Sequence, residues 1–275
     1  MAHATSLSNH QSEVYATNAS FVYSAKYTHA VLSLLDPQPG EKIIDLGCGT
    51  GDLTLKIKDA VGDQGEVVGV DSSESMLSKA ESASDGNITY LQADIQDLPK
   101  VLDAKYKGAF DAVFTSAVLH WTKRDPRGVV EGISWLLKPG GRFVFEFGGF
   151  GNTVGIRSGI HQVLRDKGVD PEPLDPWYFP TAAQYTKLLK DTGLNPSEDI
   201  ALYPRPTPLP GDLKGWLQTF VRNTFFAAFT SEEQETMMGQ VQDICRVDNH
   251  WADEDGKEGW EIMYVRLRGS ATKSQ

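Results

Sequence analysis

The sequence has few cysteines, fewer basic than acidic residues, and no long apolar run. Its 275 residues include two cysteines, Cys48 and Cys245, too few for a disulfide scaffold, which favours a reducing compartment. The 37 acids outnumber the 26 lysines and arginines, and the net charge of −11 disfavours nucleic acid and anionic membranes as partners. No apolar segment is long enough to span a bilayer, and residues 1–12 lack the basic start and apolar core of a signal peptide. We therefore expect a cytoplasmic protein that binds neither nucleic acid nor a membrane.

What the sequence does have is a glycine-rich stretch at residues 42–54. A short apolar run ends in Asp45, and Gly47, Gly49 and Gly51 follow at alternate positions before a helical pattern begins. These features predict a strand, a tight turn and a helix start, and a ligand can approach the turn closely because glycine has no Cβ. One residue separates the last two glycines, whereas a dinucleotide-binding fingerprint has two there, and Asp45 would repel a pyrophosphate. The turn is therefore predicted to bind a ligand that carries positive charge.

Two later apolar segments also end in an acid. Asp71 follows residues 66–70, at a spacing from the glycines that is typical of a carboxylate bound to ribose hydroxyls. Asp71 could instead cap the helix expected at 74–82, but a cap does not explain acids at two neighbouring strand ends, so we favour the ligand role. After the next apolar segment, Asp94 could accept a hydrogen bond from an adenine amine while Ile95 packs on the ring, or it could be only a turn residue.

Strands and helices alternate over the first part of the chain. This alternation predicts an α/β fold in which a mainly parallel sheet carries helices on both faces. Such sheets bind ligands at the carboxyl ends of their strands, so residues 116–121, which follow the fourth strand, are expected at the site. The expected strands are residues 42–45, 66–71, 88–93, 110–116 and 142–147.

The motifs along the chain resemble those of the class I S-adenosylmethionine (SAM) dependent methyltransferases. The segment Leu119-His120-Trp121 resembles specifically the trans-aconitate methyltransferase branch. The resemblance implies a Rossmann-like, seven-stranded, mainly parallel sheet, a last strand antiparallel to the fifth, and a helical lid over the carboxyl ends of the strands. It also implies SAM as cofactor and S-adenosylhomocysteine as product. The motifs that occur in the family's order are residues 45–51, 70–77, 93–95, 110–121 and 137–141.

The resemblance further implies a domain organisation and a cofactor site, and no metal is expected. Residues 1–40 would form a helical lid segment, 41–150 the SAM-binding core, 151–259 the substrate-side helices and cap with one core strand, and 260–275 the last core strand and tail. The residues implied to bind SAM come from the N-terminal segment, the glycine turn and the following strand ends: Tyr15, Phe21, Val22, Asp45, Gly47, Cys48, Gly49, Asp71, Ser72, Met76, Asp94, Ile95, Ser116, Ala117 and Trp121.

His120 is the candidate catalytic residue, because it is the histidine at a strand end in this half of the chain. A hydroxyl acceptor requires a general base, whereas a carboxylate with a pKa of about 4 is already ionised and requires none. His120 could therefore be a base, or it could only orient the substrate or cofactor. Arg222 and Arg157 are candidate anchors for a substrate carboxylate, with Trp177 and Phe225 as apolar contacts, although the aromatic residues here could equally be core.

We therefore expect a SAM-dependent O-methyltransferase (EC 2.1.1.-) that acts on a small molecule. The resemblance implies the carboxylate of a small di- or tricarboxylic acid as the acceptor. One alternative is transfer to a hydroxyl, nitrogen or carbon of a secondary metabolite, because fold does not fix substrate. Another is a SAM-binding partner subunit without catalysis. The sequence leaves open whether the protein is a monomer or a homodimer.

Overall fold

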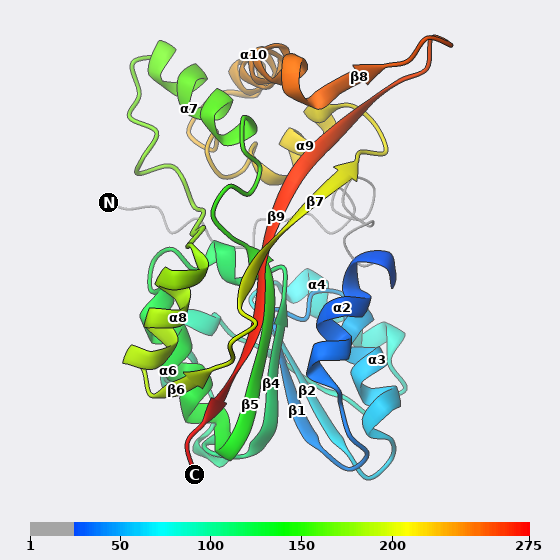
Figure 1. Ribbon diagram of the computed structural model, residues 1–275, viewed down its shortest axis with the longest axis vertical. Coiled ribbons are helices and arrows are strands. Elements are labelled where there is room, and N and C mark those ends of the chain that lie inside the picture. The colour runs from blue at the N-terminus through cyan, green and yellow to red at the C-terminus, as the bar shows by residue number, and fades with distance from the viewer. Residues whose placement is uncertain (1–24) are drawn as a thin grey trace.

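A single sheet runs through the computed structural model, which describes residues 25–275 (Figure 1). Strands β1 to β5 are parallel, in the order β3-β2-β1-β4-β5, and β9 continues the sheet antiparallel to β5. The expected position of the last strand is therefore confirmed. The strands are β1 (Lys42–Leu46), β2 (Glu66–Asp71), β3 (Thr89–Gln92), β4 (Phe110–Ser116), β5 (Leu137–Gly148), β6 (Leu194–Pro196), β7 (Ala201–Pro208), β8 (His250–Ala252) and β9 (Glu258–Lys273).

The sheet has nine described strands rather than the seven expected. Seven lie on the main path, and β7 and β8 pair with β9 beside it. The physical reason is the length of β9, whose 16 residues extend past β5 and pair with β6, then β7, and finally β8. The strand beyond β5 therefore joins the parallel sheet to the opposite end of the molecule (Figure 1).

Helices cover both faces of the parallel strands, as expected. Alternating side chains of β1 point to opposite faces: Ile43 packs with α2 and α3, and Ile44 with α6 and α8. The helices are α2 (Ala25–Leu35), α3 (Asp52–Val61), α4 (Glu74–Ala83), α5 (Leu98–Val101), α6 (Pro126–Leu136), α7 (Ile156–Asp166), α8 (Ala182–Asp191), α9 (Leu213–Phe220) and α10 (Ser231–Asn249), with 3-10 turns η3 (Ile95–Asp97), η4 (Ala104–Tyr106) and η5 (Leu119–Trp121). None of the helices in this range combines the length and apolar character needed to cross a membrane.

A separate apolar cluster forms the cap beyond the carboxyl ends of the parallel strands. Helices α7, α9 and α10 pack there against the first half of β9 (Figure 1). The helix α9 of this cap ends at Phe220. The Arg222 N–H donates to the Leu217 carbonyl and the Thr224 hydroxyl donates to the Phe220 carbonyl at 2.7 Å, so the last turn is closed locally. Phe225 and Phe226 follow in turns and are fully buried.

Candidate active site

The glycine turn after β1 is held in an unusual backbone conformation. Gly47 has a φ of 77°, and a Cβ at this position would lie 2.2 Å from a methyl group of Val118. The backbone N–H groups of Gly47 and Cys48 both donate to the Val70 carbonyl at the end of β2. Only glycine fits at position 47, because the positive φ and the close neighbour both exclude a side chain.

Asp45 is buried beneath this turn, with its side chain directed to α3. Its Oδ2 accepts a hydrogen bond of 2.7 Å from the Thr54 hydroxyl. Burial raises the pKa of Asp45 to about 7, and the nearby Asp71 charge adds to the rise, while the Thr54 hydrogen bond opposes it. The carboxyl group is therefore harder to ionise than that of an exposed aspartate.

Asp71 lies at the end of β2 and is tied to the glycine turn. Its Oδ2 accepts from the Gly49 N–H at 3.0 Å and its Oδ1 from the Ser73 N–H at 2.9 Å. Burial raises the pKa of Asp71 although these hydrogen bonds oppose the shift. The helix α4 is capped by Ser73, whose hydroxyl accepts from the Met76 N–H. Ser73, and not Asp71, therefore caps helix α4, and the Asp71 side chain lines a cleft.

We call that opening the glycine-loop cleft. It has a volume of about 290 Å³, open to solvent, and brings together five of the residues expected to bind a cofactor. Asp94 lies at its edge, where it accepts from the Gln96 N–H at 2.9 Å and pairs with Arg124 at 3.1 Å. The Ser72 hydroxyl is buried and has no hydrogen-bond partner in the part of the chain that the structure describes. The lining residues are Gly47, Asp71, Ser72, Ala93, Asp94, Ile95, Gln96, Val118 and Thr122.

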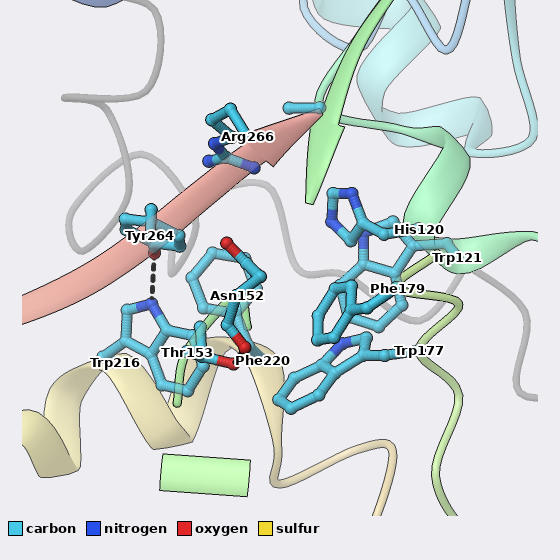
Figure 2. A pocket seen from close by; sticks show the side chains of 11 residues that line it. His120, Trp121, Asn152, Thr153, Trp177, Phe179, Trp216, Phe220, Tyr264 and Arg266 are labelled. Carbon is cyan, nitrogen blue, oxygen red and sulfur yellow. Dashed lines mark hydrogen bonds between the residues drawn. The ribbon is translucent and has the colours of Figure 1, made fainter. Parts of the chain in front are cut away.

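A second cavity of about 430 Å³, the aromatic pocket, lies between the sheet and the cap (Figure 2). Trp177 stacks on Phe179 with ring centroids 5.5 Å apart and meets Trp121 edge-on at 6.2 Å. The Trp216 indole N–H donates to the Tyr264 hydroxyl at 2.6 Å. The lining residues are Ala117, His120, Trp121, Asn152, Thr153, Trp177, Phe179, Trp216, Phe220, Tyr264 and Arg266.

Residues 117–122, which follow β4, line both cavities. Val118 and Thr122 contribute to the glycine-loop cleft, whereas Ala117, His120 and Trp121 contribute to the aromatic pocket. Ala117 has a φ of 61°, an uncommon conformation for a residue with a Cβ. This segment therefore places a ligand in one cavity next to a ligand in the other.

His120 is held against the end of β5. Its Nδ1 accepts a hydrogen bond of 3.3 Å from the Gly148 N–H. The ring also lies 5.3 Å from Trp121 and 6.1 Å from Phe179, measured between centroids. The imidazole is thus oriented by the backbone of one strand and by two aromatic neighbours.

Several residues predicted for the site lie elsewhere. Arg157 pairs with the buried Asp175 at 2.6 Å and Arg222 pairs with Glu235 at 2.9 Å, and neither lines the glycine-loop cleft or the aromatic pocket. Phe225 is core and meets Trp177 edge-on. Asp45, Cys48, Gly49, Met76 and Ser116 line neither cavity, and Tyr15, Phe21 and Val22 lie outside the described residues.

Seven residues that line the aromatic pocket were not predicted as site residues: Asn152, Thr153, Phe179, Trp216, Phe220, Tyr264 and Arg266. Tyr264 and Arg266 lie on the same face of β9, where buried and half-buried side chains alternate. The available signal was an arginine within an apolar, alternating strand. Such a residue is unexpected on a core face and points to a site.

Comparisons with known proteins identify the family to which the chain belongs. A family described as a methyltransferase domain matches residues 37–149. An uncharacterised methyltransferase of Schizosaccharomyces pombe is 34% identical over 267 residues, covering 94% of this chain and 96% of that protein. The chain belongs to the class I SAM-dependent methyltransferases. A Bacillus halodurans structure described as that of a methyltransferase shares the fold, with a TM-score of 0.62, 13% identity, and coverage of 91% of this chain and all of that one.

Two shorter matches come from methyltransferases with different acceptors in their names. A ubiquinone/menaquinone biosynthesis C-methyltransferase of Vibrio parahaemolyticus is 40% identical over 116 residues, 40% of this chain and 42% of that protein. A trans-aconitate 2-methyltransferase of Deinococcus radiodurans is 35% identical over 109 residues, 40% of this chain and 38% of that protein. These partial matches support the methyltransferase family and do not separate one acceptor from another.

SAM is the cofactor of this methyltransferase, and the glycine-loop cleft has the groups to hold it. Asp71 would offer carboxylate oxygens to ribose hydroxyls, Asp94 would offer them to the adenine amine, and Ile95 would offer an apolar surface to the ring. The unpartnered Ser72 hydroxyl is the group that a polar ligand would satisfy, because a buried polar atom without a partner is costly.

Proposed function

We propose that this enzyme transfers the SAM methyl group to a carboxylate oxygen of a small organic acid in the aromatic pocket. The observation that supports this choice is the hydrogen bond from the Gly148 N–H to His120 Nδ1, at 3.3 Å. A neutral imidazole has one donor and one acceptor nitrogen. Because Nδ1 accepts from an amide, the proton of the neutral ring lies on Nε2, and His120 is a donor toward a substrate. A carboxylate needs no base, whereas a hydroxyl acceptor would.

Bound SAM supplies a methyl group already activated by its sulfonium. The task of the chain is to hold the acceptor in line and to exclude water, and alignment alone can contribute roughly 7 to 11 kcal/mol. Asp71 and Asp94 fix the nucleoside end of the cofactor, and residues 117–122 separate it from the acceptor. The aromatic walls keep the pocket dry, which favours a reaction in which the opposite charges of the sulfonium and the carboxylate disappear.

The experiment is a turnover assay on a panel of acceptors, after calorimetry has shown that SAM binds. The panel contains aliphatic di- and tricarboxylic acids, aromatic acids and phenols. A carboxyl methyl ester releases methanol in mild alkali, whereas a methyl ether or a C-methyl product does not. We expect an alkali-labile product and, at saturating SAM, a rate that does not fall on the acid side until the acceptor itself is protonated.

The other outcomes identify the alternatives. An alkali-stable methylated phenol would overturn the carboxylate proposal and favour hydroxyl or carbon methylation. SAM binding without turnover on any member of the panel would favour a partner subunit that has lost catalysis. In both cases the assignment of SAM to the glycine-loop cleft would remain.

A further inference from the structure

We infer that Arg266 anchors the acceptor's carboxylate and that the aromatic pocket selects a planar, mostly apolar acid with a single negative charge. This inference rests on the proposed function and narrows it, because the resemblance alone implied a di- or tricarboxylic acid. It also replaces the predicted anchors Arg157 and Arg222, both of which are engaged in ion pairs outside the pocket.

Arg266 is a buried charge without an acidic partner among residues 25–275. Its side chain lines the aromatic pocket and is 4% exposed, and its Nε is buried without a hydrogen-bond partner. Glu146, the acid on the neighbouring strand, is instead paired with Arg268 at 3.1 Å and Arg205 at 3.5 Å. Within residues 25–275, the interaction found for the Arg266 guanidinium is with the Tyr264 ring, 4.6 Å away.

A buried guanidinium without an anion is costly, because burial removes its hydration. Native structures rarely leave such a group unmatched unless it has a functional role. A cation–π contact with one tyrosine compensates only part of this cost. A carboxylate entering the pocket would supply the missing partner, since the planar guanidinium can donate two parallel hydrogen bonds to it.

The position of Arg266 suits an anchor for the reacting group. Arg266 lies opposite Gly148 in the β5–β9 ladder, and the Gly148 N–H donates to His120. Arg266 and His120 therefore adjoin the same residue, and Figure 2 shows both at the same rim of the pocket, above the aromatic rings. A carboxylate bound to Arg266 would lie within reach of the segment that separates the two cavities.

The surrounding charges also favour an anion at this point. Arg205 and Arg266 occupy one face of neighbouring strands, on either side of Tyr264. Burial lowers the pKa of Arg205 to about 10, and repulsion by Arg266 contributes to the decrease. Although the chain as a whole is acidic, this face has three arginines for one glutamate, so an anion bound here would reduce the repulsion.

The lining of the pocket limits the rest of the acceptor. Its described residues provide one guanidinium, no lysine and no carboxylate, and six of the eleven are tryptophan, phenylalanine or tyrosine. A tricarboxylate would bury two further charges against rings without a cation to match them. A phosphate monoester carries about two negative charges at neutral pH, also more than one guanidinium matches. A planar apolar body would instead stack on Trp177 and Phe179.

The test measures binding of three probes to the protein saturated with S-adenosylhomocysteine, by calorimetry. The probes are cinnamate, its neutral amide, and trans-aconitate. We expect the wild type to bind cinnamate more tightly than trans-aconitate. Arg266→Met should weaken cinnamate about tenfold or more, the loss of a charge-assisted pair, and should leave the amide within about twofold. Arg266→Lys should recover part of the cinnamate affinity, because it restores the charge without the fork geometry.

Arg127→Met is the matched control, because it removes the same charge from an exposed site on α6, paired with Glu131. It should change none of the three affinities. Equal cinnamate binding by wild type and Arg266→Met, or tighter binding of trans-aconitate by the wild type, would overturn the inference. Loss of S-adenosylhomocysteine affinity in Arg266→Met would also overturn it and assign Arg266 to the cofactor. An alkali-stable product would overturn the carboxylate acceptor alone, and the Arg266 dependence of cinnamate binding would still stand.

Discussion

The segment 117–122 lines both the glycine-loop cleft and the aromatic pocket, but the rest of each cavity is formed by different parts of the chain. The cleft is made by turns at the ends of adjacent strands, all between Gly47 and Thr122, with backbone groups and carboxylates at its surface. The pocket is made by large side chains from segments as far apart as Ala117 and Arg266. If SAM binds in the cleft and the acceptor in the pocket, as proposed, cofactor recognition depends largely on the turns and acceptor recognition on large side chains.

This difference indicates how one fold can keep the same cofactor while its acceptor changes. The turns of the cleft are fixed by the parallel sheet, so a change there disturbs both the sheet and the cofactor. The walls of the pocket come from the cap and from β9, and side chains can be exchanged there without altering a turn. Substitutions on the two sides of residues 117–122 should therefore separate SAM affinity from acceptor affinity.

The largest effect is expected for Gly47→Val, on the cofactor side. A valine would have to adopt a φ of 77° and would overlap Val118, where a Cβ already meets a methyl group at 2.2 Å. Strain and overlap together should weaken SAM about 100-fold or more, measured by calorimetry on protein shown to be folded by its thermal transition. Gly62→Val is the control, because Gly62 also has a positive φ of 67° but has nothing near its missing Cβ. Normal SAM affinity in folded Gly47→Val would contradict the backbone explanation.

A smaller effect is expected for Asp71→Ala. The variant loses the carboxylate proposed for the ribose hydroxyls and the hydrogen bond that holds the Gly49 N–H. SAM should bind about tenfold more weakly or worse, while the affinity for an acceptor acid, measured at saturating cofactor, stays the same. Ser73→Ala is the control, since it removes the cap of α4 and lies outside the cleft. If SAM bound Asp71→Ala as tightly as the wild type, Asp71 would belong to the fold and not to the site.

The contrast between the cavities also explains how far the sequence could predict them. Gly47, Asp71 and Asp94 were predicted because each lies at the end of an expected strand. The ends of parallel strands meet at one edge of the sheet, so their position in the sequence indicates their position in space. The parallel order of β1 to β5 follows from the same alternation of strands and helices. In this half of the chain, the order of residues in the sequence therefore predicts which residues meet at the site.

The pocket could not be predicted in this way. Trp216, Tyr264 and Arg266 meet the rest of the lining only because β9 continues past β5 and pairs with β7. That pairing joins residues about sixty positions apart in the chain, Arg205 with Tyr264 among them. Arg157 and Arg222 were predicted as anchors because a guanidinium can bind a carboxylate through two hydrogen bonds, whereas the arginine that lines the pocket, Arg266, lies on a strand.

A third prediction concerns pH and the buried Asp45, whose pKa is raised to about 7. A bound sulfonium nearby would favour the ionised form and lower this pKa, so binding releases protons below pH 7. Affinity for SAM should therefore rise between pH 6 and 8, by up to about tenfold, and then level off. S-adenosylhomocysteine lacks the sulfonium and should show a weaker dependence.

Asp45→Asn should abolish the difference in pH dependence between SAM and S-adenosylhomocysteine. The amide oxygen can still accept a hydrogen bond from Thr54, but the side chain no longer titrates. Asp59→Asn, which changes an exposed carboxylate on the same helix as Thr54, is the control and should retain the difference. Calorimetry at pH 6, 7 and 8 measures all three proteins. If Asp45→Asn showed the same pH dependence as the wild type, the titrating group would be a residue other than Asp45.

The smallest effect is expected for Trp177→Leu, on the acceptor side of the comparison. Leucine keeps an apolar wall but removes the stack on Phe179 and the edge contacts to Trp121 and Phe225. An aromatic pair contributes about 0.5 to 1.5 kcal/mol beyond its buried area, so an aromatic acceptor should bind roughly two- to tenfold more weakly. SAM affinity should not change, because Trp177 does not line the glycine-loop cleft. Trp251→Leu, at a partly exposed tryptophan on β8, is the matched control and should leave both affinities intact. A loss of SAM affinity as large as the loss of acceptor affinity in Trp177→Leu would mean that the two cavities respond as one, and that residues 117–122 couple them rather than divide them.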